Sequence, residues 1–131
     1  MTETEKMTPY AALGGEAVLR KLTKRFYELM DTLPEAKACR DIHPKDLSRS
    51  EEKLFEYLSG WLGGPPLFTD KYGPPMLRRR HLPAKIGGAE AEGWLLCFRQ
   101  AWAEVIGDNA LGAALLPQIE ALGQHMINQA A

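Results

Sequence analysis

Residues 61–94, WLGGPPLFTDKYGPPMLRRRHLPAKIGGAEAEGW, carry most of the information about this fold. Glycines and prolines recur so often from Gly63 to Pro75 that an irregular loop is predicted there, and not a strand. Only Met76 to His81 could make another helical turn or two, because Pro83 restrains the residue before it. The stretch therefore places a histidine at the end of a short helix, directly after three arginines.

Amphipathic helices are predicted on both sides of this stretch, because apolar residues recur there at the spacing of one helical face. Ser48 and Glu51 have the form of a capping box at the start of one helix. Pro117 stands where the last helix is expected to begin, at a position that tolerates proline. No window alternates with period two, so no sheet is predicted. The helices are expected over residues 18–33, 48–62, 89–106 and 117–128.

Length and composition indicate one globular domain. A chain of 131 residues, 45% hydrophobic and 25% charged, suits a single domain, which we expect over residues 10–131 after a flexible tail of residues 1–9. The tail lacks a secretory pattern and the most apolar stretch, residues 107–116, is too short to cross a bilayer. We therefore expect a cytoplasmic, soluble protein. A net charge of -1 gives no general attraction to nucleic acid, and two cysteines are too few for a disulfide framework.

His81 is the first candidate for chemistry. A histidine at a helix end can direct one ring nitrogen at a metal while the other donates to a backbone carbonyl, and haem iron is commonly held in this way. The neighbouring arginines, Arg78 to Arg80, would then pair with the two carboxylates of a haem. Two simpler interpretations stay open here. In the first, His81 is only a surface histidine in a basic loop. In the second, the arginine run is a solvated stretch or a contact for an anionic partner.

Other residues also have both a packing and a functional interpretation. Tyr27 lies at the edge of the first apolar stripe, so its hydroxyl faces either an interior space or water. Trp94, on the stripe of the longest predicted helix, is either plain core or a buried N–H donor that needs a partner. His43 by itself is a loop histidine, and Ser50 and Leu54 share one helix face. The sequence contains no nucleophile motif, P-loop or dinucleotide fingerprint, so any chemistry is expected to belong to a cofactor.

Taken together, an ordered set of motifs strongly resembles the group II truncated haemoglobins of bacteria, over roughly Tyr10 to Asn128. The most specific part is the interval from Gly-Gly-Pro to Arg-His, followed by Trp94 thirteen residues after His81. The glycine pair Gly14-Gly15 fits the pair that follows the family's reduced first helix. The motifs are Phe26-Tyr27, His43-Pro44, Trp61-Leu62-Gly63-Gly64-Pro65, Tyr72-Gly73, Arg80-His81-Leu82-Pro83 and Trp94.

The resemblance implies an all-α fold, a two-over-two helical sandwich around haem b. His81 matches the proximal ligand of the iron, so a metal role is expected for this residue. Arg80 and Lys53 match residues that pair with the haem propionates. Leu54 and Trp94 are expected to contact the haem as well. After Pro83 the family more usually has a phenylalanine, where this chain has Ala84-Lys85, so the proximal side is expected to be packed differently.

The resemblance also implies a polar distal pocket for the ligand. Tyr27 and Trp94 match hydrogen-bond donors, and His43 matches a third polar position that varies between tyrosine, phenylalanine and histidine. Ser50 and Leu54 match positions above the haem. Phenol, indole and imidazole donors in a dry pocket stabilise the partial negative charge of a dioxygen ligand. His43 or Tyr27 could itself occupy the iron when no external ligand is present.

The resemblance implies oxygen binding and oxygen transport, and binding of the other diatomic ligands nitric oxide and carbon monoxide. A nitric-oxide-detoxifying or peroxidase-like activity toward peroxide would need a partner reductase, because the sequence has no flavin or nicotinamide site. The alternative is a cofactor-free helical binding module whose Arg78–Arg80 cluster contacts an acidic partner. Replacement of His81 separates the two hypotheses, since haem retention depends on this residue in the first one alone.

Overall fold

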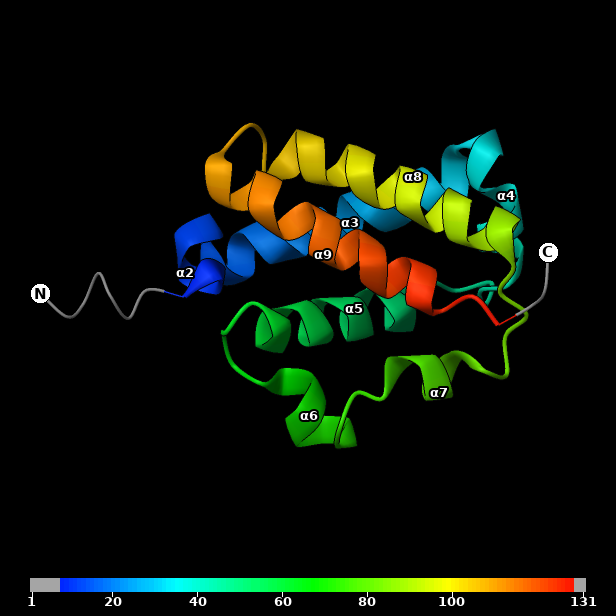
Figure 1. Cartoon of the computed structure of the whole chain (residues 1–131), viewed down its shortest axis with the longest axis horizontal. Helices are drawn as coiled ribbons and strands as arrows, with labels where there is room; N and C mark the ends of the chain where they lie inside the picture. Colours follow the sequence, from blue (N-terminus) through cyan, green and yellow to red (C-terminus); the bar gives the residue numbers. More distant parts are fainter. Residues whose placement is uncertain (1–7, 129–131) are drawn as a thin grey trace, which may run out of the picture.

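Two pairs of long helices form the body of the protein. The computed structural model of the chain describes residues 8–128, apart from the side chain of Arg78, and these residues contain helices and no strand. α3 (Gly15–Thr32) packs against α5 (Ser48–Trp61), and α8 (Gly88–Val105) packs against α9 (Ala110–His125). The chain runs in opposite directions within each pair, and α8 also packs along α3 (Figure 1). The predicted all-helical class is confirmed.

Short helices connect and flank the long ones. Helices α6 and α7 lie along the edge of the molecule that is farthest from α3 and α8 in Figure 1. The 3-10 helix η1 and helix α4 pack on α8, next to the end of α3. The short elements are α2 (Pro9–Leu13), η1 (Pro34–Ala36), α4 (Lys37–Asp41), α6 (Leu67–Tyr72) and α7 (Leu77–His81).

The start of the described chain is ordered by a helix cap. The Thr8 hydroxyl accepts a hydrogen bond from the Ala11 N–H over 3.2 Å, and Pro9 is the first residue of α2. Gly14 and Gly15 make the turn from α2 into α3. Their φ angles of 120° and 71° are positive, and other residues adopt such angles only with strain. Residues 1–7 of the tail that was predicted over residues 1–9 lie outside the described part of the chain.

The core lies where the apolar stripes of α3, α5 and α8 meet. Phe26 is fully buried at its centre and contacts the rings of Trp94 and Phe98 at centroid distances of 5.3 and 5.7 Å. Phe55 on α5 and Ile119 on α9 close the core from the other two long helices. None of the described helices combines the length and apolar character needed to cross a membrane.

The predicted capping box at Ser48 is wrong. Ser48 is the first residue inside α5, and its backbone N–H and its hydroxyl both donate to Oδ1 of Asp46, over 2.9 and 2.6 Å. These two bonds also lower the pKa of Asp46 below its usual value. The stronger acceptor two residues upstream therefore organises this turn, and Glu51 has no capping role.

The predicted irregular loop from Gly63 to Pro75 contains a helix. α6 occupies the six residues between the two glycine- and proline-rich ends of this stretch. Phe68 is its buried anchor, and Gly73, at a φ angle of 83°, ends the helix. The density of glycine and proline at the ends concealed a short segment that contains neither residue.

The last helix begins at Ala110 and not at Pro117. The Asn109 side chain accepts a hydrogen bond from the Gly112 N–H over 2.6 Å, which caps the helix seven residues before the predicted start. Pro117 lies inside α9 and cannot donate to the carbonyl of Ala113. Because Ala113 is exposed, water can satisfy that carbonyl, so the proline is tolerated.

Candidate functional site

All eight site residues expected from the sequence line one cavity. Its volume is about 490 Å³, within the range of roughly 300–1,000 Å³ that is usual for cofactor pockets. The cavity opens between α5, α7, α8 and α9, and its walls are largely apolar, with Leu58, Phe68 and Ile119 among them. The expected residues in its wall are Tyr27, His43, Ser50, Lys53, Leu54, Arg80, His81 and Trp94.

His81 enters the cavity wall from the last residue of α7. Its Nδ1 lies 2.6 Å from the carbonyl oxygen of Leu77. A carbonyl oxygen can only accept, so Nδ1 carries the proton of this bond. In the neutral ring, Nε2 then carries a lone pair. This tautomer suits a metal ligand, and the bond to Leu77 fixes the orientation of the ring.

Tyr27 and Trp94 contribute donors to the cavity from α3 and α8. Tyr27 is 7% exposed, and burial raises the pKa of its hydroxyl well above the usual value, so the hydroxyl stays protonated. Among residues 8–128, no protein group accepts a hydrogen bond from the Tyr27 hydroxyl or the Trp94 N–H. Both donors are therefore available to a ligand in the cavity.

The Trp94 ring is held on three sides. It stacks on Phe98 at a centroid distance of 5.0 Å and meets the edge of Phe26. On the third side lies Gly123 of α9, where a Cβ atom would come within 3.0 Å of the indole ring. The absence of a side chain at Gly123 therefore lets α9 approach α8 and leaves room for the indole at the cavity wall.

His43 lies next to Tyr27, just after α4, with the two ring centroids 6.0 Å apart. Its Nδ1 is 2.8 Å from the carbonyl oxygen of Cys39, so Nδ1 is again the protonated nitrogen. Burial lowers the pKa of His43; the Cys39 bond opposes this shift, and the charges of Arg40 and His81 add to it. At neutral pH the ring is uncharged, and its Nε2 is an acceptor.

Two cations stand at the rim of the cavity. The Arg80 guanidinium donates through Nε to the carbonyl of Pro75 over 2.7 Å, and through Nη2 to those of Tyr72 and Pro74 over 2.7 and 3.0 Å. Its two Nη1 protons remain for another acceptor. The Lys53 ammonium lies 5.2 Å from the centre of the Tyr72 ring, within the range of a cation–π contact.

Comparison with known proteins settles the family. A family profile described as bacterial-like globin matches residues 8–128. The chain belongs to the bacterial-like globin family. It is 39% identical to the group 2 truncated hemoglobin YjbI of Bacillus subtilis (strain 168), over 92% of this chain and 89% of that protein.

Solved structures agree with this assignment. The group II 2-on-2 hemoglobin of Agrobacterium tumefaciens superposes on this globin with a TM-score of 0.93 and 56% identity, over 96% of this chain and 98% of that one. The cold-adapted truncated hemoglobin of Pseudoalteromonas haloplanktis TAC125 gives a TM-score of 0.90 and 42% identity, over 95% and 100% of the two chains. The predicted resemblance to group II truncated haemoglobins and the two-over-two fold are confirmed.

Membership of the globin family implies haem-based binding of diatomic gases such as oxygen. The cavity of this globin fits a haem in three respects. Its walls are apolar, His81 presents a nitrogen lone pair, and cations stand at the rim where carboxylates would lie. The comparisons do not favour the cofactor-free module. In addition, three of the five guanidinium N–H groups of Arg80 already donate to backbone carbonyls of residues 72–75. The side chain of Arg78 lies outside the described part of the structure.

The sequence did not indicate several residues of this globin's site. Ile86 directly follows Ala84-Lys85, where the chain departs from the family. It is 6% exposed and lines the cavity, as does Ala84 itself. Asn128 forms hydrogen bonds with the segment between α7 and α8. No local pattern marks either residue, because their positions depend on how the end of the chain folds back. Glu56, fully buried on α5, was likewise not expected.

Proposed function

We propose that this globin is a haem b protein that reversibly binds dioxygen, nitric oxide and carbon monoxide, with His81 as the iron ligand. The observation that carries the proposal is the 2.6 Å contact between Nδ1 of His81 and the Leu77 carbonyl oxygen, which places the Nε2 lone pair of the neutral ring in the cavity wall. When bound, haem supplies an iron centre with an open position for a diatomic gas. The protein supplies the orientation of His81 and the polar surroundings of the gas.

Tyr27 and Trp94 are proposed to donate hydrogen bonds to the gas. Both donors lack a protein partner among the described residues, so ligand binding would break no bond within the protein. In surroundings of low dielectric constant, such donors stabilise a ligand with partial negative charge more than they would in water. Ser50 and Leu54, one turn apart on α5, would line the same space.

His43 is proposed to act as an acceptor and not as a third donor. The uncharged ring has its proton on Nδ1, toward Cys39, so Nε2 offers a lone pair. That lone pair can accept the single Tyr27 hydroxyl proton, which would then compete with the gas for this donor, or it can bind the iron when no gas is present. We therefore expect the resting spectrum to depend on the residue at position 43.

Arg80 and Lys53 are proposed to hold the haem carboxylates. Arg80 has two free N–H groups on Nη1, and three bonds to backbone carbonyls fix its guanidinium in place. Turnover of nitric oxide or peroxide is a further step that we propose to require a partner reductase. Formation of nitrate from nitric oxide and dioxygen, or reduction of peroxide to water coupled to oxidation of an added electron donor, tests that step.

The proposed function is tested by the visible spectrum of the protein and of His81→Ala. The wild type should take up haemin and show a Soret band that shifts when the reduced protein is exposed to carbon monoxide. His81→Ala should lose most haem on gel filtration, whereas His125→Ala, which changes an exposed histidine of α9, should retain it. A colourless wild type that refuses added haemin would overturn the proposal, as would normal haem retention in His81→Ala.

A further inference from the structure

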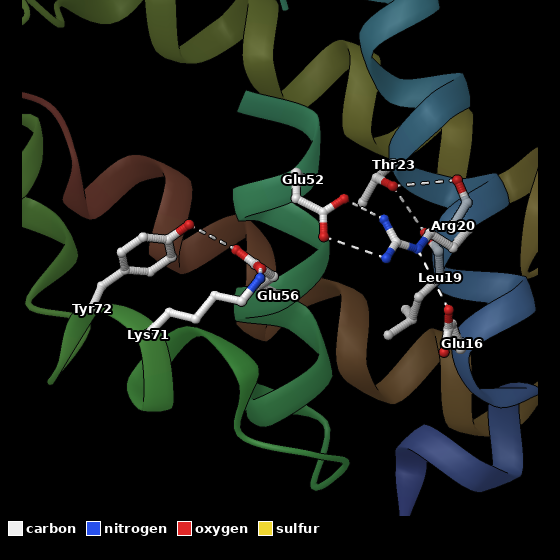
Figure 2. Close-up of polar contacts among 8 residues, drawn as sticks. All are labelled: Glu16, Leu19, Arg20, Thr23, Glu52, Glu56, Lys71 and Tyr72. Atoms are coloured by element: carbon white, nitrogen blue, oxygen red, sulfur yellow. Dashed lines mark hydrogen bonds and ion pairs between the residues drawn. The ribbon is translucent and has the colours of Figure 1, made fainter. Parts of the chain in front are cut away.

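Helix α5 buries a carboxylate next to the apolar side chains of Phe55 and Leu58. Glu56 is 0% exposed, and a buried carboxylate is costly unless charged or hydrogen-bonded partners surround it. Both partners come from α6 (Figure 2): Lys71 forms an ion pair with Oε2 of Glu56, and the Tyr72 hydroxyl donates to Oε1 over 3.2 Å. The buried carboxylate therefore fixes the end of α6 on α5.

Tyr72 connects this buried pair to both cations of the cavity rim. Its ring lies under the Lys53 ammonium at 5.2 Å, and its backbone carbonyl accepts a hydrogen bond from Nη2 of Arg80 over 2.7 Å. The same ring contacts Phe68 at a centroid distance of 4.8 Å. Phe68 lines the cavity and lies 5.2 Å from the Arg80 guanidinium carbon. One tyrosine thus contacts the side chain of one cation and holds the other through its backbone.

Two acids of α5 that are close to Lys53 in sequence, Glu52 and Glu56, are already engaged. Glu52 forms an ion pair with Arg20 of α3, and Glu56 forms one with Lys71 (Figure 2). Within residues 8–128 no carboxylate forms an ion pair with Lys53. Its positive charge, placed over the face of Tyr72, therefore remains available for a carboxylate that enters from the cavity.

We propose that Tyr72, held by Glu56, is a positioning residue for the carboxylates of haem. It keeps the unpaired ammonium of Lys53 at the cavity rim through its ring, and it steadies Arg80 through its carbonyl. The inference rests on the proposed function, because it names the residue that acts on the carboxylate end of the same site. It predicts an effect that depends on the haem carboxylates and not merely on the fold.

The test compares haemin with haemin dimethyl ester, in which both carboxylates are blocked. Each porphyrin is loaded into wild type, Tyr72→Leu, Tyr72→Phe and Lys53→Ala, and its dissociation rate is measured by transfer to an excess of a haem-free scavenger protein. Tyr10→Leu makes the same chemical change at a tyrosine of α2 that does not line the cavity, and it serves as the matched control. Thermal unfolding of each loaded variant reports separately on the fold.

Tyr72→Leu and Lys53→Ala should each release haemin about two- to fivefold faster than wild type, while the rates for the dimethyl ester stay unchanged. The double variant should release haemin no faster than the faster of the two single variants, because both substitutions remove the same contact. Tyr72→Phe keeps the ring and the backbone carbonyl but loses the bond to Glu56, so its haemin rate should be intermediate.

Two results would overturn the inference. Equal acceleration of both porphyrins by Tyr72→Leu would show that the residue merely supports the fold, and an unchanged haemin rate would show that it does not act on the carboxylates. In both cases wild type still takes up porphyrin, so the proposed function survives. Failure of wild type to take up either porphyrin would overturn the proposed function and this inference with it.

Discussion

Asn128 and Ile86 exchange two hydrogen bonds. The Asn128 N–H donates to the Ile86 carbonyl over 2.7 Å, and the Ile86 N–H donates to Oδ1 of Asn128 over 3.0 Å. Nδ2 of Asn128 also donates to the carbonyls of Ala84 and His81, over 2.8 and 3.3 Å. The end of the described chain thus holds the connecting segment, residues 81–86, that begins at the proposed iron ligand.

Asn128→Ala should loosen the connecting segment. The change removes the acceptor of the Ile86 N–H and the donor to two carbonyls, so we expect a loss of about 1–3 kcal/mol in the free energy of unfolding. Amide hydrogen exchange at Ile86 should become faster. Asn128→Asp keeps the Oδ1 acceptor and loses the Nδ2 donors, so it should preserve the protection of Ile86 better. Equal exchange rates at Ile86 in wild type and Asn128→Ala would contradict this account.

Tyr27→Phe should speed the release of dioxygen. The substitution removes one hydroxyl donor and keeps the ring that packs against Phe26 at 4.7 Å. Loss of one hydrogen bond corresponds to roughly 0.5–1.5 kcal/mol, so the dissociation rate should rise about two- to tenfold. Stopped-flow replacement of dioxygen by carbon monoxide measures this rate. If it does not change, the stabilisation belongs to Trp94, and Trp94→Phe should then show the larger effect.

The stability of the haem-free protein should fall as the pH is lowered through the ordinary pKa of histidine. Because the pKa of His43 in the folded protein is below the ordinary value of 6.5, the unfolded chain binds more protons between the two values. The resulting loss in the free energy of unfolding is absent well above pH 6.5 and reaches its full size below the pKa of His43 in the folded protein. Urea titrations of wild type and His43→Phe across this range should give a difference in unfolding free energy that varies with pH. A constant difference would refute the shift.

Gly123→Ala should disturb Trp94. A methyl group there would lie 3.0 Å from a rigid indole ring that Phe98 and Phe26 already hold, so the helices or the ring must shift. We expect a destabilisation of about 1–3 kcal/mol and a changed Trp94 fluorescence. Gly88→Ala is the matched control, since an added Cβ there meets nothing within 4 Å. A Gly123→Ala protein as stable as this control would show that α9 adapts freely.

Local patterns predicted the long helices well where one side of each helix is buried. The apolar spacing along α3 and α8 identified both helices to within a few residues, because periodicity of 3.6 depends on the helix itself. The starts of α9 and α5 depend instead on local hydrogen bonds. Asn109 caps α9 through one bond and Asp46 organises the turn before α5 through two, and several nearby residues could have made such bonds equally well. Helix α6 was missed because the glycines and prolines at its two ends concealed it.

The sequence by itself determined which residue types could bind haem and the order in which they occur. His81, Tyr27 and Trp94 were selected because an ordered set of motifs resembled one family, and no single motif was sufficient. Only the tertiary structure decided that these residues share one cavity, that Glu56 is buried under α6, and that the end of the chain returns to residues 81–86. Burial and long-range hydrogen bonds depend on which distant segments pack together, and no local window of sequence contains that information.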